Sequence, residues 1–341
     1  MYALAKFDVT LAAKVAFLRQ PSSFPEPGYR IEAIETHMSW VFLTQNSAWK
    51  LKKPVRQDAL DFSTLEARRF YCEEEVRLNR RLAPDVYLGT VALTLDPFGH
   101  LQIGGDGAVA DWLVRMRRLP VDQMLDHAIQ HETVTAEDFI RIAACLAGFH
   151  RDAETADLSG PAYRARFQHR IDGCREELVA PRYALPVDQI EAIVGLQCGF
   201  LSHKAFLLDQ RIAAGDIIEG HGDLRPEHVC LSTPLAIIDC LEFSRDLRLI
   251  DTADEIGFLA LECERLGATD AGTDFVYQYS LQSGDWPDAC LRHFYQSCRA
   301  TVRATLAIRH VDEEQFRYSP QWPQRTRHYL ELAQLHAEHL N

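Results

Sequence analysis

The feature that most constrains this chain is a loop followed by a short apolar strand, each of which carries an aspartate. The loop reads His-Gly-Asp-Leu-Arg-Pro-Glu-His over residues 221–228 and contains Asp223. The apolar run 235–238 follows and ends at a second carboxylate, Asp239. A carboxylate at the end of a buried strand is costly unless it is paired or bound to a metal ion. The pattern indicates a chemical site, and the alternative is a turn in which Asp223 only caps the backbone.

Two aspartates in this arrangement suit phosphoryl transfer from ATP. Asp223 would orient and deprotonate an attacking hydroxyl, and Asp239 would hold the Mg²⁺ that bridges the phosphates. For Asp239 the alternative is a structural carboxylate, and the nearby Glu242 either assists it or lies on the surface. The pair of aspartates therefore predicts a kinase chemistry.

The size and charge of the chain limit its class and its partners. With 341 residues it is long enough for two lobes, each with its own core. Its 47% apolar and 25% charged residues are those of an ordinary globular protein. The formal net charge of −13 argues against a nucleic-acid partner, since phosphate backbones are bound by clustered lysine and arginine.

The cysteines and the apolar runs bear on the compartment. Nine cysteines are scattered without a C-x-x-C pair, so neither a zinc cage nor a disulfide framework is expected. No secretory signal is visible, and no run approaches the ~20 apolar residues that a membrane span needs. We therefore expect a cytoplasmic protein with reduced thiols and no membrane partner.

Sequence patterns divide the chain into a mostly β first third and a mainly helical remainder. Two strands around a turn are predicted at 39–44 and 48–55, and Thr135 with Asp138 forms a capping-box signature. Further strands are expected at 86–95, 99–103 and 108–116. The predicted helices cover 65–82, 139–150, 163–178, 187–213, 252–266, 274–281, 288–310 and 324–340.

This organisation, together with the His-Gly-Asp-Leu loop, resembles the aminoglycoside-phosphotransferase branch of the protein-kinase-like fold. The resemblance covers nearly the whole chain. Segments 35–43 and 78–85 look closer still to one uncharacterised bacterial subgroup, some members of which carry an extra C-terminal P-loop ATPase domain. No G-x-x-x-x-G-K-[ST] occurs here, so only the kinase-like part is expected. The resemblance implies an α+β fold with a small β-rich N-lobe (1–116) and a larger helical C-lobe (117–341).

The resemblance also implies an ATP-anchoring lysine on the third strand, paired with a glutamate of the following helix. Lys50 and Lys52 share one face of a strand, and alignment with the kinase pattern favours Lys52. Of the three consecutive glutamates at 73–75, similarity to the subgroup favours Glu75. A solvated run of charges is the alternative for each of these residues.

Two further nucleotide contacts are expected from position alone. No G-x-G-x-x-G is present, and Thr36 and Ser39 occupy the turn that would cover the phosphates. Ser39 could contact phosphate, although an ordinary β-turn explains the same residues. Met116 falls where backbone groups of a kinase hinge bind adenine.

Arg225 and His228 complete the loop. Arg225 matches a lysine that lies near the transferred phosphate in Ser/Thr kinases, and a guanidinium could stabilise charge there. His228 replaces the usual asparagine metal ligand, and imidazole is a poor substitute for an amide oxygen on Mg²⁺. Three outcomes are open: a weak second metal site, tolerance of Mn²⁺, or a bond from His228 to the catalytic aspartate.

The resulting prediction is an ATP-dependent phosphotransferase that acts on a hydroxyl of an unidentified small molecule. The first alternative is a pseudokinase that binds nucleotide without turnover, because His228 and the missing glycines depart from the pattern. A protein kinase fits less well, since no Ala-Pro-Glu element follows Asp239. Arg299 and Arg303, at helical spacing, could point into an acceptor cleft, but solvent exposure or ion pairing is the favoured interpretation. The oligomeric state is not indicated.

Overall fold

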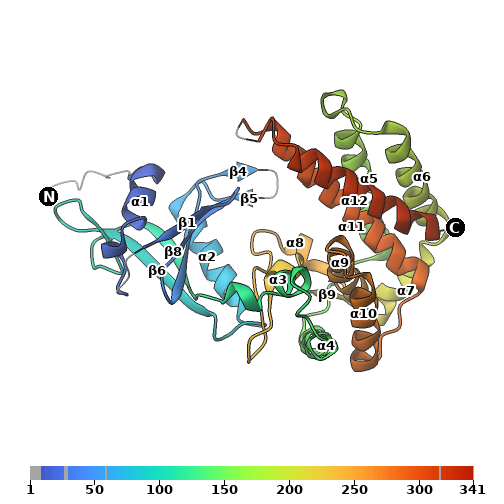
Figure 1. Cartoon of the computed structure of the whole chain (residues 1–341), viewed down its shortest axis with the longest axis horizontal. Coiled ribbons are helices and arrows are strands. Elements are labelled where there is room, and N and C mark those ends of the chain that lie inside the picture. The colour runs from blue at the N-terminus through green and yellow to red at the C-terminus, as the bar shows by residue number, and fades with distance from the viewer. Residues whose placement is uncertain (1–8, 27–29, 58–59, 315, 341) are drawn as a thin grey trace. The chain divides into compact units, whose positions relative to one another are not determined.

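The computed structural model describes residues 9–26, 30–57, 60–314 and 316–340, and the chain forms two compact units (Figure 1). The first unit comprises residues 1–124 and 228–246, and the second comprises residues 125–227 and 247–341. The loop that carries Asp223 thus belongs to the second unit, whereas His228 and Asp239 belong to the first.

An antiparallel sheet of six strands forms the first unit, in the order β1-β2-β3-β8-β6-β7. Two small hairpins, β4–β5 and β10–β11, and two helices accompany it, and α2 lies against β8. The elements are α1 (Leu11–Leu18), β1 (Glu32–Glu35), β2 (Ser39–Leu43), β3 (Ser47–Lys52), β4 (Arg56–Gln57), β5 (Leu60–Asp61), α2 (Leu65–Asn79), β6 (Tyr87–Leu95), β7 (Leu101–Ile103), β8 (Ala108–Arg117), β10 (Val229–Cys230) and β11 (Ala236–Ile237).

The predicted hairpin is present as β2 and β3, and its alternation orients the lysines. The amide of Ser47 donates to Thr44 Oγ1 (3.0 Å), which closes the turn. Successive side chains of a strand point to opposite faces. Trp49 and Leu51 pack on one face with the core around α1, so Lys50 and Lys52 point to the other face.

Helix α2 begins after the N-cap Thr64, whose hydroxyl accepts from the amide of Ala67 (3.1 Å). Cys72 and Val76 of this helix pack against β8 residues in a buried cluster. The helix ends at Asn79, earlier than the predicted 82, because the chain turns there and the amide of Leu82 bonds the carbonyl of Asn79 (3.1 Å).

Residues 228–246 join the first unit although they lie far along the sequence. Cys230 and Ala236 share the buried cluster of α2, and the amide of Cys240 donates to Asn79 Oδ1 (2.9 Å). The compact unit also runs to Met124. Its division therefore differs from the predicted lobes 1–116 and 117–341, because these long-range contacts are not visible in local patterns.

The second unit is built almost entirely of helices. A short antiparallel pair, β9–β12, accompanies them, and helix α8 (Arg245–Arg248) spans the boundary between the units. The elements are α3 (Leu125–Gln130), α4 (Ala136–Asp152), α5 (Gly160–Leu178), α6 (Val187–His203), α7 (Phe206–Ala214), β9 (Ile217–Glu219), β12 (Leu249–Asp251), α9 (Thr252–Arg265), α10 (Thr269–Ser283), α11 (Ala289–Arg309) and α12 (Gln321–Ala337).

The helix predicted over 187–213 is two helices, which corrects that expectation. Lys204 caps α6, and its ammonium donates to the carbonyl of Leu340 (3.0 Å), so a tertiary contact holds the break. The capping box of Thr135 and Asp138 is present at the start of α4, as predicted.

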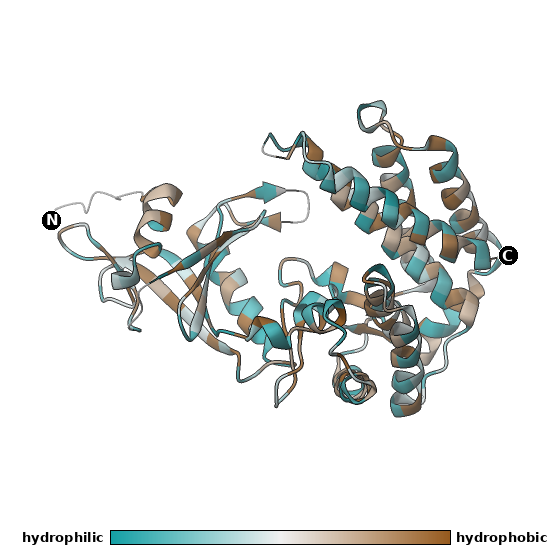
Figure 2. Ribbon diagram, viewed as in Figure 1, coloured by the Kyte–Doolittle hydropathy of each residue, from teal (hydrophilic) through white to brown (hydrophobic). Residues whose placement is uncertain are grey.

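The core of the second unit is aromatic, with Phe167, Phe200, Phe294 and Tyr295 packed together. Figure 2 shows apolar and polar residues alternating along helices such as α11 and α12, as helices with one buried face require. Among the residues that the structure describes, no helix has the length and apolar character needed to cross a membrane.

Candidate active site

Lys50 of β3 contacts two carboxylates that come from distant parts of the chain. Its Nζ lies 2.9 Å from Glu75 Oε1 on α2 and 3.0 Å from Asp239 Oδ1, just after β11. Burial alone would lower the pKa of Lys50, but the charges of Asp239, Glu75 and Glu242 outweigh it and hold the pKa well above its usual value. Lys50 is therefore a fixed positive charge at the point where strand, helix and Asp239 meet.

Lys52 lies two residues along the same face but is completely buried. Its Nζ lies 2.6 Å from Glu75 Oε2 and also bonds Glu242, and the ring of Phe62 covers it at 4.9 Å. Here too burial would lower the pKa, and the two carboxylates raise it. None of the side chain of Lys52 is exposed, so its ammonium contacts only protein groups.

Glu75 accepts from both lysines and links them. Burial would raise the pKa of Glu75, but Lys50 and Lys52 lower it, so the carboxylate is ionised. With Asp239 and Glu242 the cluster contains three carboxylates and two ammonium groups, which leaves one excess negative charge. Such a cluster can accept a cation beside Asp239.

Asp239 adopts an unusual backbone conformation. Its φ is +63°, in the left-handed region that a non-glycine residue occupies at a cost of about 1–3 kcal/mol. Its amide donates to Tyr87 Oη (3.1 Å), which helps to hold this geometry. Its side chain is 46% exposed, in contrast to Lys52 and Glu75. A strained residue with an accessible carboxylate is the type of group that functional sites retain.

His228 lies beside Asp239, with Nε2 3.5 Å from Asp239 Oδ2. Within the described residues, no three His, Cys, Asp or Glu side chains are arranged to hold a metal ion. The protein would thus offer chiefly Asp239, which suits Mg²⁺, because this ion usually keeps several waters and takes other ligands from phosphates. Imidazole is a poorer ligand for this ion, and a metal role for His228 stays a prediction.

In the second unit, the loop that carries Asp223 is fixed by Glu255 of α9. The amides of His221 and Gly222 both donate to Glu255 Oε1, at 2.9 and 2.6 Å. Gly222 has a φ of +87°, and a Cβ on Gly220 would lie only 2.7 Å from Glu255 Oε2. The left-handed φ favours glycine at Gly222, and the close approach of Glu255 favours it at Gly220.

A buried chain of hydrogen bonds continues behind the loop. His150 Nε2 lies 3.0 Å from Glu255 Oε2, and its Nδ1 lies 2.8 Å from Tyr279 Oη. Burial would raise the pKa of Glu255, but the bond and charge of His150 and the loop groups lower it to about 2. Sequence reasoning missed Glu255 and His150. The sequence carries only a weak signal for Glu255, because it is one of several carboxylates, among them Asp254 and Glu262, in the apolar-rich segment that forms α9.

Arg225 pairs with Asp223 itself. Its Nε and Nη2 lie 3.1 and 3.0 Å from Asp223 Oδ2, and the amide of Asp223 bonds His221 Nδ1 (3.3 Å). The side chain of Asp223 is 22% exposed. Arg225 therefore orients the carboxylate of Asp223 in this structure.

Arg299 and Arg303 both form ion pairs, which was one of the roles predicted for them. Arg299 makes two bonds to Asp254, at 2.7 and 3.0 Å, and its Nη1 lies 3.4 Å from the carbonyl of Gly222. Arg303 lies 3.5 Å from Glu262. Arg299 therefore contacts the Asp223 loop directly, whereas Arg303 is held by Glu262 of α9.

Ser39 and Met116 lie in buried positions of the sheet. The amide of Ser39 donates to Thr36 Oγ1 (3.0 Å), and the hydroxyl of Thr36 donates to the carbonyl of Ser39 (3.0 Å). This is the capped turn that was the alternative for these residues. Met116 pairs with Ala48 and Tyr87 in the sheet. A phosphate contact for Ser39 and an adenine contact for Met116 stay predictions.

Comparisons of sequence find relatives of longer length. No protein-family model matches the chain. Uncharacterised proteins of Mycobacterium tuberculosis and Mycobacterium bovis are 35% identical over 282 residues. The match covers 81% of this chain and 54% of those proteins, so the chain spans about half the length of the curated relatives it matches.

Comparisons of structure find small-molecule kinases. A choline/ethanolamine kinase family protein from Mesorhizobium loti matches with a TM-score of 0.53 and 13% identity, over 96% of this chain and 98% of that one. A choline kinase from Cryptosporidium parvum matches with a TM-score of 0.51 and 11% identity, over 93% of each chain. An aminoglycoside phosphotransferase from Streptomyces rimosus, solved with ADP and streptomycin, matches with 0.50 and 15%, over 86% and 98%.

These likenesses identify the fold. The chain has the protein-kinase-like fold found in small-molecule kinases and aminoglycoside phosphotransferases. The α+β fold class and the family resemblance expected from the sequence are confirmed at this level.

Proposed function

We propose that this chain is an ATP-dependent phosphotransferase that transfers the γ-phosphoryl group to a hydroxyl of a small molecule. The observation that carries the proposal is the contact of Lys50 Nζ with both Glu75 and Asp239. A lysine fixed by a helix glutamate beside a strand-end aspartate supplies the charge arrangement that a phosphorylated nucleotide needs. The solved kinases that share the fold, one of them with bound ADP, support the choice of reaction.

Lys50, and not the lysine favoured by sequence alignment, is the better candidate for the phosphate contact. Lys50 retains 15% exposure and touches Asp239, whereas Lys52 is enclosed and held by two carboxylates. Releasing Lys52 to a ligand would remove its ion pairs with the buried carboxylates of Glu75 and Glu242, which is costly. We therefore assign Lys52 to holding Glu75 in place.

Asp223 would act as the base. It would accept the proton of the acceptor hydroxyl as the hydroxyl oxygen bonds to the γ-phosphorus and the bond to the bridging oxygen breaks, with ADP leaving. Glu255 would keep the loop backbone fixed, and Arg225 would keep the carboxylate of Asp223 oriented. Mg²⁺, when held by Asp239, would supply neutralisation of the phosphate charge.

A second candidate is a nucleotide-binding module without turnover. The observation that favours it is the imidazole of His228 beside Asp239, where the kinase pattern has an amide oxygen. This substitution weakens the donor set for a second metal ion. The two candidates differ in turnover and agree in nucleotide binding.

The test combines binding with turnover. Thermal unfolding is measured with ATP in Mg²⁺ and in Mn²⁺, and ADP formation is measured with a panel of neutral and cationic alcohols, since the chain is acidic. A ligand at about 100 times its Kd stabilises the protein by about 2.7 kcal/mol. We expect Asp239→Asn to lose this stabilisation, and Asp223→Asn to keep it but lose turnover.

The outcomes separate the candidates. Nucleotide binding without ADP formation on any alcohol would favour the regulatory module. Absence of nucleotide binding with either metal would contradict both. A cytoplasmic location is part of the proposal and is checked by fractionation of cells that express the protein.

A further inference from the structure

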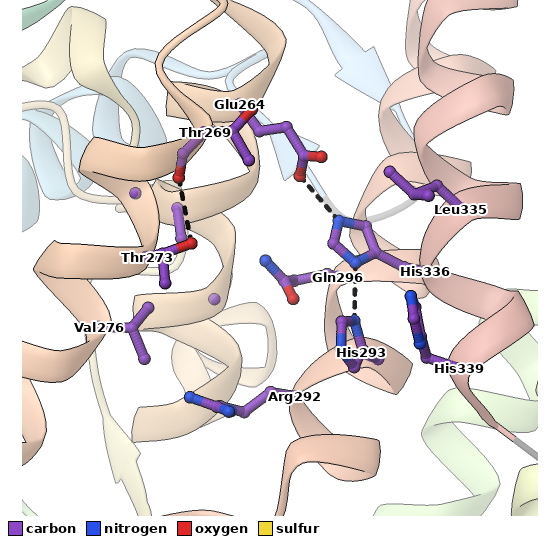
Figure 3. Close-up of a pocket in the computed structure, with 13 residues that line it drawn as sticks. Glu264, Thr269, Thr273, Val276, Arg292, His293, Gln296, Leu335, His336 and His339 are labelled. Carbon is purple, nitrogen blue, oxygen red and sulfur yellow. Dashed lines mark hydrogen bonds and ion pairs between the residues drawn. The ribbon is translucent and has the colours of Figure 1, made fainter.

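A cavity of about 300 Å³ in the second unit lies among helices α9, α10, α11 and α12 (Figure 3). None of the residues assigned to the active site above lines it. Its α9 and α10 side has the small or apolar residues Gly257, Ala260, Gly272 and Val276, together with Thr269, Thr273 and Glu264. The opposite side, formed by α11, α12 and the turn after α12, carries Arg292 and three histidines. The cavity thus has a small, partly apolar side that faces a guanidinium and a group of imidazoles.

The histidines form a chain of hydrogen bonds that ends at a carboxylate. His336 Nε2 lies 2.9 Å from Glu264 Oε2, and His336 Nδ1 lies 2.9 Å from His293 Nδ1. The ring of His339 stacks on His293 with centroids 4.4 Å apart. Glu264 therefore bonds His336, and His293 is at the other end of this series of hydrogen bonds.

Arg292 has no counter-charge of its own. Its Nε is buried without a hydrogen-bond partner, and no carboxylate within residues 9–26, 30–57, 60–314 and 316–340 pairs with its guanidinium. Arg211 and Arg299 of the same unit are, by contrast, each held by aspartates. Figure 3 shows Arg292 and Gln296 extending from α11 toward α10. The carboxylate that lines the cavity, Glu264, is paired with His336, so the guanidinium of Arg292 is arranged to receive another anion.

We propose that this cavity binds a small organic anion, with its carboxylate on Arg292 and His293 and its apolar body against Ala260 and Val276. The anionic group would supply the missing partner of the guanidinium. The small residues along α9 and α10 leave room for the apolar body. The site is distinct from the Asp223 loop, because Arg292 and Arg299 are seven residues, or roughly 10 Å, apart along α11.

Proton uptake is a signature of this binding. Burial, with the charges of His336, His339 and Arg292, lowers the pKa of His293 to about 4. Glu264 faces the cluster from α9 and is paired with His336, and the lining residues of α10 are uncharged. A bound anion would raise the pKa of His293. Binding therefore takes up a proton, and affinity falls as the pH rises.

The probe is benzoate, titrated into the full chain without nucleotide by calorimetry at pH 6 and pH 8. Wild type should bind benzoate, more tightly at pH 6. Arg292→Gln should weaken binding by about tenfold or more, the effect of a lost charge-assisted bond. Arg309→Gln, on an exposed end of the same helix, is the matched control and should bind as wild type does.

Val276→Phe is the second variant, since it narrows the cavity without a change of charge, and it should also weaken binding. Circular dichroism checks that each variant is folded.

Equal benzoate affinity of wild type and Arg292→Gln, or no binding by wild type, would overturn the proposal. If inorganic phosphate bound as tightly as benzoate, the proposed contact of an apolar body with Ala260 and Val276 would be wrong. Zn²⁺ binding that His293→Asn abolishes would replace the anion site with a metal site. No outcome depends on phosphoryl transfer.

Discussion

Replacing Lys52 by methionine should lower stability, whereas replacing Lys50 by methionine should lower turnover. Lys52 is fully buried between Glu75 and Glu242, whose side chains are 1% and 7% exposed. Breaking a buried pair by removing one partner costs about 3–5 kcal/mol, because the remaining charge is left without compensation. We expect Lys52→Met to lower the free energy of unfolding by this amount, with a fall in Tm of roughly 4–7 °C for a chain of this length.

Lys50→Met should leave the fold nearly intact. Glu75 keeps Lys52 as its partner, and Asp239 is 46% exposed and can be solvated, so we expect a loss of about 1 kcal/mol. The loss should appear instead in turnover, by a factor of about 10²–10³, because a fixed charge on the phosphates is removed. The two variants thus separate a structural lysine from a phosphate-binding one.

The assay is urea unfolding for stability and steady-state ADP formation for turnover, on the same preparations. Lys53→Met is the matched control, since Lys53 pairs with the exposed Glu35 and should change neither quantity by much. The reasoning is wrong if Lys52→Met is as stable as wild type, or if Lys50→Met turns over ATP normally while a folded Lys52→Met does not.

Three further predictions concern the Asp223 loop, the Glu255 carboxylate that holds it, and His228. The pKa of Glu255 is depressed to about 2 from an ordinary value of about 4.5, so its contribution to stability is present above pH 4.5 and is lost as the pH falls toward 2. Acid titration of the unfolding free energy should show this loss in wild type and a smaller one in Glu255→Gln. Asp223→Asn should reduce kcat by about 10²–10⁴ with unchanged ATP affinity in equilibrium binding. His228→Asn restores an amide oxygen and should raise Mg²⁺-supported turnover relative to Mn²⁺, which parallel assays would show; an unchanged ratio would mean that His228 does not influence the metal.

Several elements of the site could be predicted because they depend on local patterns. The loop with Asp223 and the apolar strand before Asp239 are contiguous in the sequence, and strand alternation places Lys50 and Lys52 on one face without knowledge of the rest. The strands around 39–52 and the capping box at Thr135 are local as well. Such features follow from period and from neighbouring residues alone.

Other elements depended on contacts between distant residues. A helix with glutamates at 73, 74 and 75 does not by itself show which one meets a lysine, and only the packing of α2 on the sheet buries Glu75. The break between α6 and α7 and the addition of residues 228–246 to the first unit are also contacts across long separations.

The sequence by itself determined which side chains are available for the proposed chemistry: two aspartates, a pair of lysines and a loop that contains glycine. The tertiary structure decided which lysine is accessible, and it brought Glu255 and His150 behind the loop. The physical reason is that residue type and spacing can be read from a short stretch of sequence. The burial that separates Lys52 from Lys50, and the pairing that lowers the pKa of Glu255, arise only when distant segments exclude water together.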